Sequence, residues 1–202
     1  MLQVQHLGAT VVVATAADYD IRGPAMLCGS LSYRQEGTAM DPAQAGALLR
    51  RLEYTLATAE SLTGGTVGAQ ITSVAGASDY YYGGVIAYAP FIKSSLLNVP
   101  QEVIDAHGTV SEETVTAMAA GVRDLFGASV GLATTGVAGP DALEGHPAGT
   151  LFVAVADPFG TRAEQHTLDG PARLDRAAVI TWAASQAIGL LIRRLSDATQ
   201  IR

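Results

Sequence analysis

The chain has 202 residues, 49% of them hydrophobic and only 15% charged, which fits one domain whose single core is made chiefly of small aliphatic side chains. Its formal net charge is −7 and its 12 Lys and Arg residues are scattered, so nucleic acid is not an expected ligand. The single cysteine, Cys28, excludes an intramolecular disulfide, and no Cys/His cluster has metal-ligand spacing, so we expect a reducing cytoplasmic location and no metal site.

Residues 1–39 differ in pattern from the rest of the chain. One β-like run, Thr10–Ala14, is followed by turn-rich sequence, and we expect an N-terminal appendage for which poor order is one possibility. The apolar run 8–17 is too short to cross a bilayer and no Lys or Arg precedes it, so we expect neither a membrane anchor nor a signal peptide.

From Met40 onward, helix-like and strand-like patterns alternate, and we assign residues 40–202 to one domain. Asp41 and Ser111 are good helix N-caps, Pro42 suits a first helical position and Gly127 suits a helix end. The first half predicts a helix from 42, a strand at 55–59, a helix from about 66, a strand at 83–89, a short helix at 100–108 and a longer helix at 111–127.

The second half predicts a strand at 129–135, a Gly/Pro-rich loop at 136–148, a hairpin of strands 150–156 and 163–168, and a last helix at 174–195. Arg193 and Arg194 would lie near the end of that helix, where positive charge is favourable. The fold class expected from this order is α/β, a three-layer α/β/α sandwich with a mixed, mostly parallel sheet.

The segment Glu60–Gly65 is the first candidate site, because a hydroxyl follows a strand and two glycines open the next helix. Ligands of open α/β sheets bind beyond the carboxyl ends of strands, where helix N-termini present unpaired N–H donors. Ser61, Thr63, Gly64 and Gly65 could therefore bind a phosphate or an oxyanion. The alternative is that Ser61 or Thr63 only caps the helix.

Lys93 is the only lysine of the chain and follows the second predicted strand. Every other permanent positive charge in the sequence is an arginine. A lysine at this one position indicates a need for an amine that can lose its proton, which guanidinium cannot do. The alternative is a surface lysine whose uniqueness is accidental.

The loop after the third predicted strand is the third candidate. Its small residues permit close contact with a flat or anionic ligand, and Thr135 offers a hydroxyl beside Gly136 and Gly139. Glycine and proline also simply punctuate loops, so alone this signal is weak.

Taken together and in order, the motifs of Thr58–Gly65, Gly84–Tyr88 with Lys93, Thr135–Pro140 and Pro147–Thr150 resemble the CinA C-terminal domain family. The resemblance covers about residues 43–195. It implies nicotinamide-nucleotide amidase activity, in which nicotinamide mononucleotide and water give nicotinate mononucleotide and ammonia. It also implies Ser61 as nucleophile, Lys93 as its base and Tyr88 nearby.

The sequence departs from the family pattern at three places. Leu62 stands where the family usually has cysteine, and His146 where it commonly has lysine. The family's Gly-x-Arg signature is here the longer 170–173 segment, followed by Arg176.

The expected mechanism is acyl transfer by a Ser61–Lys93 pair, with the oxyanion held by backbone N–H groups around 63–65 and with Tyr88 keeping Lys93 neutral or positioning it. Arg176, His146 or a helix N-terminus would bind the substrate phosphate. No cofactor is needed, and the expected partners are the pyridine nucleotide and further copies of the chain. The alternative is a nucleotide-binding or regulatory module without catalysis.

Overall fold

The computed structural model describes residues 40–168 and 175–200. The predicted strand Thr10–Ala14, the appendage 1–39 and the 170–173 segment lie outside the described residues. In the described part of the chain, no helix combines the length and the apolar character needed to cross a membrane.

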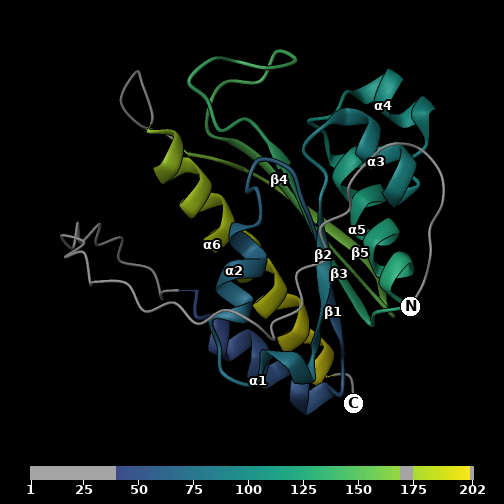
Figure 1. Cartoon of the computed structure of the whole chain (residues 1–202), viewed down its shortest axis with the longest axis vertical. Coiled ribbons are helices and arrows are strands. Elements are labelled where there is room, and N and C mark those ends of the chain that lie inside the picture. The colour runs from purple at the N-terminus through teal and green to yellow at the C-terminus, as the bar shows by residue number, and fades with distance from the viewer. Residues whose placement is uncertain (1–39, 169–174, 201–202) are drawn as a thin grey trace, which may run out of the picture. The chain divides into compact units, whose positions relative to one another are not determined.

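A five-stranded mixed sheet forms the centre of the fold (Figure 1). Its strand order is β2-β1-β3-β4-β5; β1 pairs in parallel with β2 and β3, whereas β4 runs antiparallel to both β3 and β5. The strands are β1 (Leu56–Glu60), β2 (Tyr81–Ile86), β3 (Val130–Gly136), β4 (Thr150–Asp157) and β5 (Gly160–Thr167). The predicted mixed α/β fold is confirmed.

Helices cover both faces of this sheet, and each face has its own apolar core. One core contains residues of α1 (Pro42–Leu52), α2 (Thr66–Thr72) and α6 (Arg176–Gln200). The other lies beneath α3 (Pro90–Leu97), α4 (Gln101–His107) and α5 (Glu112–Phe126). A short 3-10 helix, η1 (Ala77–Asp79), precedes β2. Because both faces are covered, every residue of β1 is buried, in keeping with a strand that has no charged side chain before its last residue, Glu60.

The predicted helix caps are present. The Asp41 carboxylate accepts the N–H of Ala43, the Ser111 hydroxyl accepts that of Thr114, and Gly127 ends α5 with a left-handed backbone. The last helix, however, continues to Gln200, because its apolar side continues through buried Leu195 and Ala198. Arg193 and Arg194 therefore do not lie in its last turn; they bind Glu164 and Asp157 of the adjacent strands.

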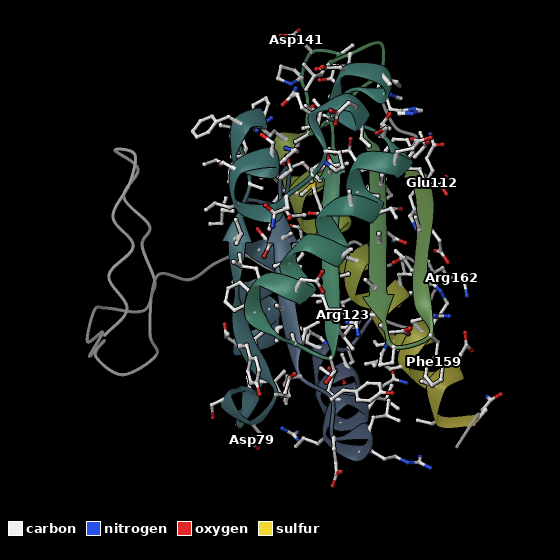
Figure 2. The ribbon with its side chains drawn as sticks, turned by 90° about the vertical axis from the view of Figure 1, so that its right-hand side faces the viewer. Asp79, Glu112, Arg123, Asp141, Phe159 and Arg162 are labelled. Atoms are coloured by element: carbon white, nitrogen blue, oxygen red, sulfur yellow. The ribbon has the colours of Figure 1, made fainter. Side chains whose placement is uncertain are left out.

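The carboxyl ends of the three parallel strands meet at one edge of the sheet. Glu60 is in register with Ile86 of β2 and with Thr134 of β3, so the segments that follow these strands converge. Figure 2 shows Asp141, in the loop after β3, at the end of the sheet opposite to Asp79, which precedes β2. The three candidate sites of the sequence analysis thus belong to one edge.

Candidate active site

Ser61 and Lys93 are in direct contact at this edge. Ser61 follows β1, and its amide N–H donates to the carbonyl of Thr134 at 3.1 Å, which holds the turn against β3. Lys93 lies in α3, and its Nζ is 3.1 Å from Ser61 Oγ. The same Nζ donates to the carbonyl of Ala87 at 2.9 Å, which orients the amine. A nucleophile and a base within hydrogen-bond reach are thereby brought together.

The Lys93 side chain is 1% exposed, although it carries an ionisable amine. Burial lowers the pKa of Lys93 from 10.5 to about 8, while the nearby Glu144 carboxylate acts in the opposite direction. A fraction of the amine is therefore neutral near physiological pH, as a general base requires. The alternative interpretation, in which Lys93 is a surface residue, is therefore wrong.

The amino end of α2 is occupied by the chain's own carboxylate. Glu60 is 3% exposed, and it accepts the amide N–H groups of Gly65 at 2.9 Å, Val67 at 3.0 Å and Gly68 at 2.8 Å. An anion at a helix N-terminus is favoured by the helix dipole and the free N–H groups. Because Glu60 already fills this place, the end of α2 is not open to a substrate phosphate in this structure.

Two of the three amides expected around the oxyanion are used within the turn. The N–H of Gly64 donates to the Ser61 carbonyl and that of Gly65 to Glu60. Of the three, this leaves the Thr63 amide without a hydrogen bond inside the turn, and the preceding amide, of Leu62, makes none there either. Gly64 adopts φ +58°, and no atom lies within 4 Å of the position that a Cβ would take, so the turn is open on that side. The Leu62 side chain, which stands where the family usually has cysteine, is buried in the core. It therefore does not line the open side of the turn.

The threonines of the site are internal. The hydroxyls of Thr63 and Thr134 lie 2.8 Å apart and are buried. Thr135 donates its hydroxyl to the carbonyl of Thr109 at 2.7 Å, so it ties β3 to the segment before α5. The Thr135 hydroxyl proton is therefore used within the protein, and substrate binding by Thr135 stays a prediction.

Two loop glycines permit close packing. A Cβ at Gly136 would collide with the Thr150 carbonyl of β4, and one at Gly139 would lie 2.8 Å from the Cβ of Ala148. Contact within the protein therefore accounts for both glycines without a ligand.

Tyr88 bonds to Arg176 and not to Lys93. The Tyr88 hydroxyl is 2.7 Å from an Arg176 nitrogen, and a second nitrogen donates to the Gly139 carbonyl at 2.6 Å. Arg176, at the start of α6, is thus held between the segments after β2 and β3. The expectation that Tyr88 keeps Lys93 neutral is not supported, since burial lowers the pKa of Lys93.

His146 lies in the loop after β3, with its ring edge-on to Phe152 at a centroid distance of 5.8 Å. In the part of the chain that the structure describes, no group of three His, Cys, Asp or Glu side chains could hold a metal ion.

Glu144 is a site residue that the sequence analysis did not predict. Its carboxylate accepts the N–H of Thr109 at 2.7 Å, the N–H of Val110 at 3.0 Å and the Thr109 hydroxyl at 2.7 Å. Burial would raise the pKa of Glu144, but these hydrogen bonds and the charge of Lys93 lower it below its ordinary value. No local motif could reveal this role, because its partners lie 34 and 35 positions away.

Comparisons with known proteins show which family this chain is similar to. The sequence model of the CinA C-terminal domain matches residues 40–195. A CinA-like protein of Solibacter usitatus is 38% identical over 183 residues, which are 90% of this chain and 43% of that protein. A CinA-like protein of Frankia casuarinae is 45% identical over 149 residues, 74% of this chain and 34% of that protein. The chain therefore spans less than half of the length of these curated relatives.

Among solved structures, a competence-damaged protein (CinA) superfamily protein of Klebsiella pneumoniae superposes with a TM-score of 0.74. The two are 30% identical, and the superposition covers 80% of this chain and 99% of that one. The likeness therefore takes in nearly all of that structure.

Proposed function

The chain belongs to the CinA C-terminal domain family, and we propose that it is an amidohydrolase that converts nicotinamide mononucleotide and water to nicotinate mononucleotide and ammonia. The observation that carries the proposal is the 3.1 Å contact between Ser61 Oγ and the buried amine of Lys93. The substrate itself is inferred from the family resemblance.

The proposed reaction is acyl transfer in two halves. Ser61 Oγ attacks the amide carbon while neutral Lys93 takes its proton, and ammonia then leaves with a proton returned by Lys93. Water next attacks the acyl-enzyme and gives a proton to Lys93, which passes it to Ser61 Oγ as the acid departs. The hydrogen bond from Lys93 to the Ala87 carbonyl keeps the amine directed at Ser61 throughout.

The oxyanion would be held by the amides of Leu62 and Thr63, which make no hydrogen bond within the turn. Donors placed in advance at a developing negative charge are worth about 3 kcal/mol each in well-studied cases. Glu60 supports this arrangement indirectly, because its three hydrogen bonds hold the turn to α2.

We assign the substrate phosphate to Arg176. The amino end of α2 is filled by Glu60, whereas Arg176 is exposed and spends only part of its donor set on Tyr88 and Gly139. A guanidinium held in this way by its neighbours is oriented before substrate arrives.

Ammonia release from nicotinamide mononucleotide by the purified chain tests the proposal. We expect turnover by the parent, none by Ser61→Ala, and a much higher KM for the phosphate-free nicotinamide riboside. A ligand-dependent rise in melting temperature without ammonia release would instead favour the non-catalytic binding module. Loss of activity with a chelator, restored by zinc or magnesium, would contradict the Ser–Lys mechanism.

A further inference from the structure

We propose that Thr134 of β3 is a positioning residue for the nucleophile turn, residues 61–63. It binds this turn on both sides of Leu62, and so sets the place of the Ser61 hydroxyl and of the Leu62 and Thr63 amides. The catalytic consequence rests on the proposed function, whereas the hold of Thr134 on the turn does not.

Thr134 contacts the nucleophile turn at two points. Its carbonyl accepts the N–H of Ser61 at 3.1 Å, and its hydroxyl lies 2.8 Å from the hydroxyl of Thr63. Leu62, between these two residues, packs on β3 two positions further along, since a Cβ at Gly136 would lie 3.2 Å from Leu62 Cδ1. Main-chain and side-chain contacts with one short piece of β3 therefore fix both ends of the turn.

The other hydrogen bonds of the nucleophile turn do not join it to the sheet. The Ser61 and Thr63 carbonyls accept N–H groups of the turn and of the start of α2, and the Ser61 hydroxyl contacts Lys93 of α3. The three hydrogen bonds of Glu60 go to amides that follow the turn. Among the residues that the structure describes, Thr134 is thus the one sheet residue that forms hydrogen bonds with residues 61–63.

The hydroxyl pair gives this contact a length that apolar side chains would not. Thr63 and Thr134 are both buried, so each hydroxyl depends on the protein for its hydrogen bonds. Valines would fill nearly the same space, but their methyl groups would pack at about 3.5–4.0 Å. Loss of the hydrogen bond would therefore move the turn by about 1 Å, and a misplacement of this size costs up to about 100-fold in rate.

The expected loss is in kcat and not in substrate affinity. Arg176, to which we assign the substrate phosphate, is held by Tyr88 and Gly139, so removal of the Thr134 hydroxyl leaves that contact in place. The attack by Ser61 and the stabilisation of the oxyanion depend on the turn itself. A residue that only stabilised the fold would lower the melting temperature without separating kcat from KM in this way.

Valine and serine at position 134 test the hydroxyl apart from the rest of the side chain. Thr134→Val keeps nearly the same shape and the main-chain bond to Ser61 but removes the hydroxyl, whereas Thr134→Ser keeps the hydroxyl. Thr114→Val is the matched control. Thr114 of α5 is also buried, and its hydroxyl donates to the Gly108 carbonyl at 2.7 Å, outside the nucleophile turn.

With the full chain and nicotinamide mononucleotide, we expect kcat to fall about 10- to 100-fold in Thr134→Val while KM stays within about threefold of the parent. Thr134→Ser should recover most of this loss. Thr114→Val should keep the parent's kcat even where its melting temperature falls. A parent-like kcat in Thr134→Val, or an equal loss of kcat in Thr114→Val, would overturn the inference.

A double-mutant cycle tests whether Thr63 is the partner through which the Thr134 hydroxyl acts. Thr63→Val removes the same contact from the side of the turn, so its kcat should match that of Thr134→Val, and the double variant should lose no more. This arm also serves if Thr134→Val folds poorly. Losses that multiply in the double variant would mean that the two hydroxyls act separately, and would overturn the assignment.

Amide hydrogen exchange separates this inference from the proposed function. The Ser61 N–H, which donates to the Thr134 carbonyl, should exchange faster in Thr134→Val than in the parent or in Thr114→Val. Faster exchange combined with no turnover by the parent would refute the amidase proposal and leave the hold of Thr134 on the turn intact. Turnover by the parent, with Ser61 exchange unchanged in Thr134→Val, would refute the role of Thr134 alone.

Discussion

Lys93 combines two properties that a folded protein rarely joins, an ionisable amine and almost complete burial. Its neighbours include the Ala87 carbonyl and the Ser61 hydroxyl, which accept hydrogen bonds but carry no compensating charge. Keeping a lysine here lowers stability, and a methionine or leucine would fill the space without that penalty. Such a residue is typical of a functional site, where stability is given up for chemistry.

Replacing Lys93 by arginine tests its role as a base. Guanidinium keeps the positive charge but cannot accept the Ser61 proton near neutral pH, so kcat should fall on the order of 100 to 10,000-fold. Substrate affinity, measured by calorimetry with Ser61→Ala as reference, should change far less. The kcat of the double variant, Ser61→Ala with Lys93→Arg, should be hardly lower than that of either single variant, because the two residues act as one unit. A Lys93→Arg enzyme within about tenfold of the parent would make Lys93 an electrostatic anchor instead.

Replacing Lys93 by methionine should raise stability at neutral pH. The folded-state pKa of about 8 is below the ordinary 10.5, so between these values the unfolded chain binds more protons and the parent's stability rises with pH. Below pH 8 the parent bears the whole penalty, up to about 3 kcal/mol. In urea unfolding, the methionine variant should therefore have the larger free energy of unfolding at pH 6.5, and its advantage over the parent should shrink toward pH 10. A constant difference across this range would contradict the assigned pKa.

The turn between β1 and α2 shows how an element builds the site. The last residue of β1, Glu60, folds back onto the first amides of α2, so the strand and the helix hold the nucleophile between them. A carboxylate with three amide donors suits this position, because each of its oxygens only accepts hydrogen bonds.

Glu60→Gln should destabilise this turn. The glutamine side chain would direct its own N–H donors at one of the backbone N–H groups. At least one hydrogen bond is then lost and a donor is left unpaired, at a cost of about 2 kcal/mol. We expect a lower melting temperature and lost ammonia release from displacement of Ser61. Glu112→Gln, in the exposed first turn of α5, should have little effect on either. Parent-like stability and activity in Glu60→Gln would show that the turn does not depend on this carboxylate.

At the scale of the whole molecule, residues 40–195 match the family model, and every residue assigned to the site lies between 60 and 176. A chain that starts at Met40 should therefore fold and keep the kcat of the full chain. Circular dichroism melting and the ammonia assay, compared with the full chain, would test this. Insolubility, or a melting temperature lower by many degrees, would mean that residues 1–39 contribute to the folded protein.

Much of the architecture was predictable because it depends on local patterns. The caps at Asp41 and Ser111 and the end at Gly127 are each set by residues within one helical turn, and the structure has them at those positions. Strand ends were less accurate: β2 begins at Tyr81 and ends at Ile86, not at 83 and 89, because pairing with β1 sets its length and Pro90 already starts α3.

The sequence by itself determined the alternation of helices and strands, and it placed Ser61, Lys93 and the glycine-rich loop after strand ends, because hydrophobic period and turn chemistry are local properties. Only the tertiary structure decided which groups meet. Tyr88 bonds to Arg176 across 88 positions, and Glu144 reaches Thr109 across 35. Glu60 differs in being close in sequence, but its burial and the direction of its side chain depend on the sheet beside it. Side-chain partners at such distances follow from packing, which no local pattern encodes.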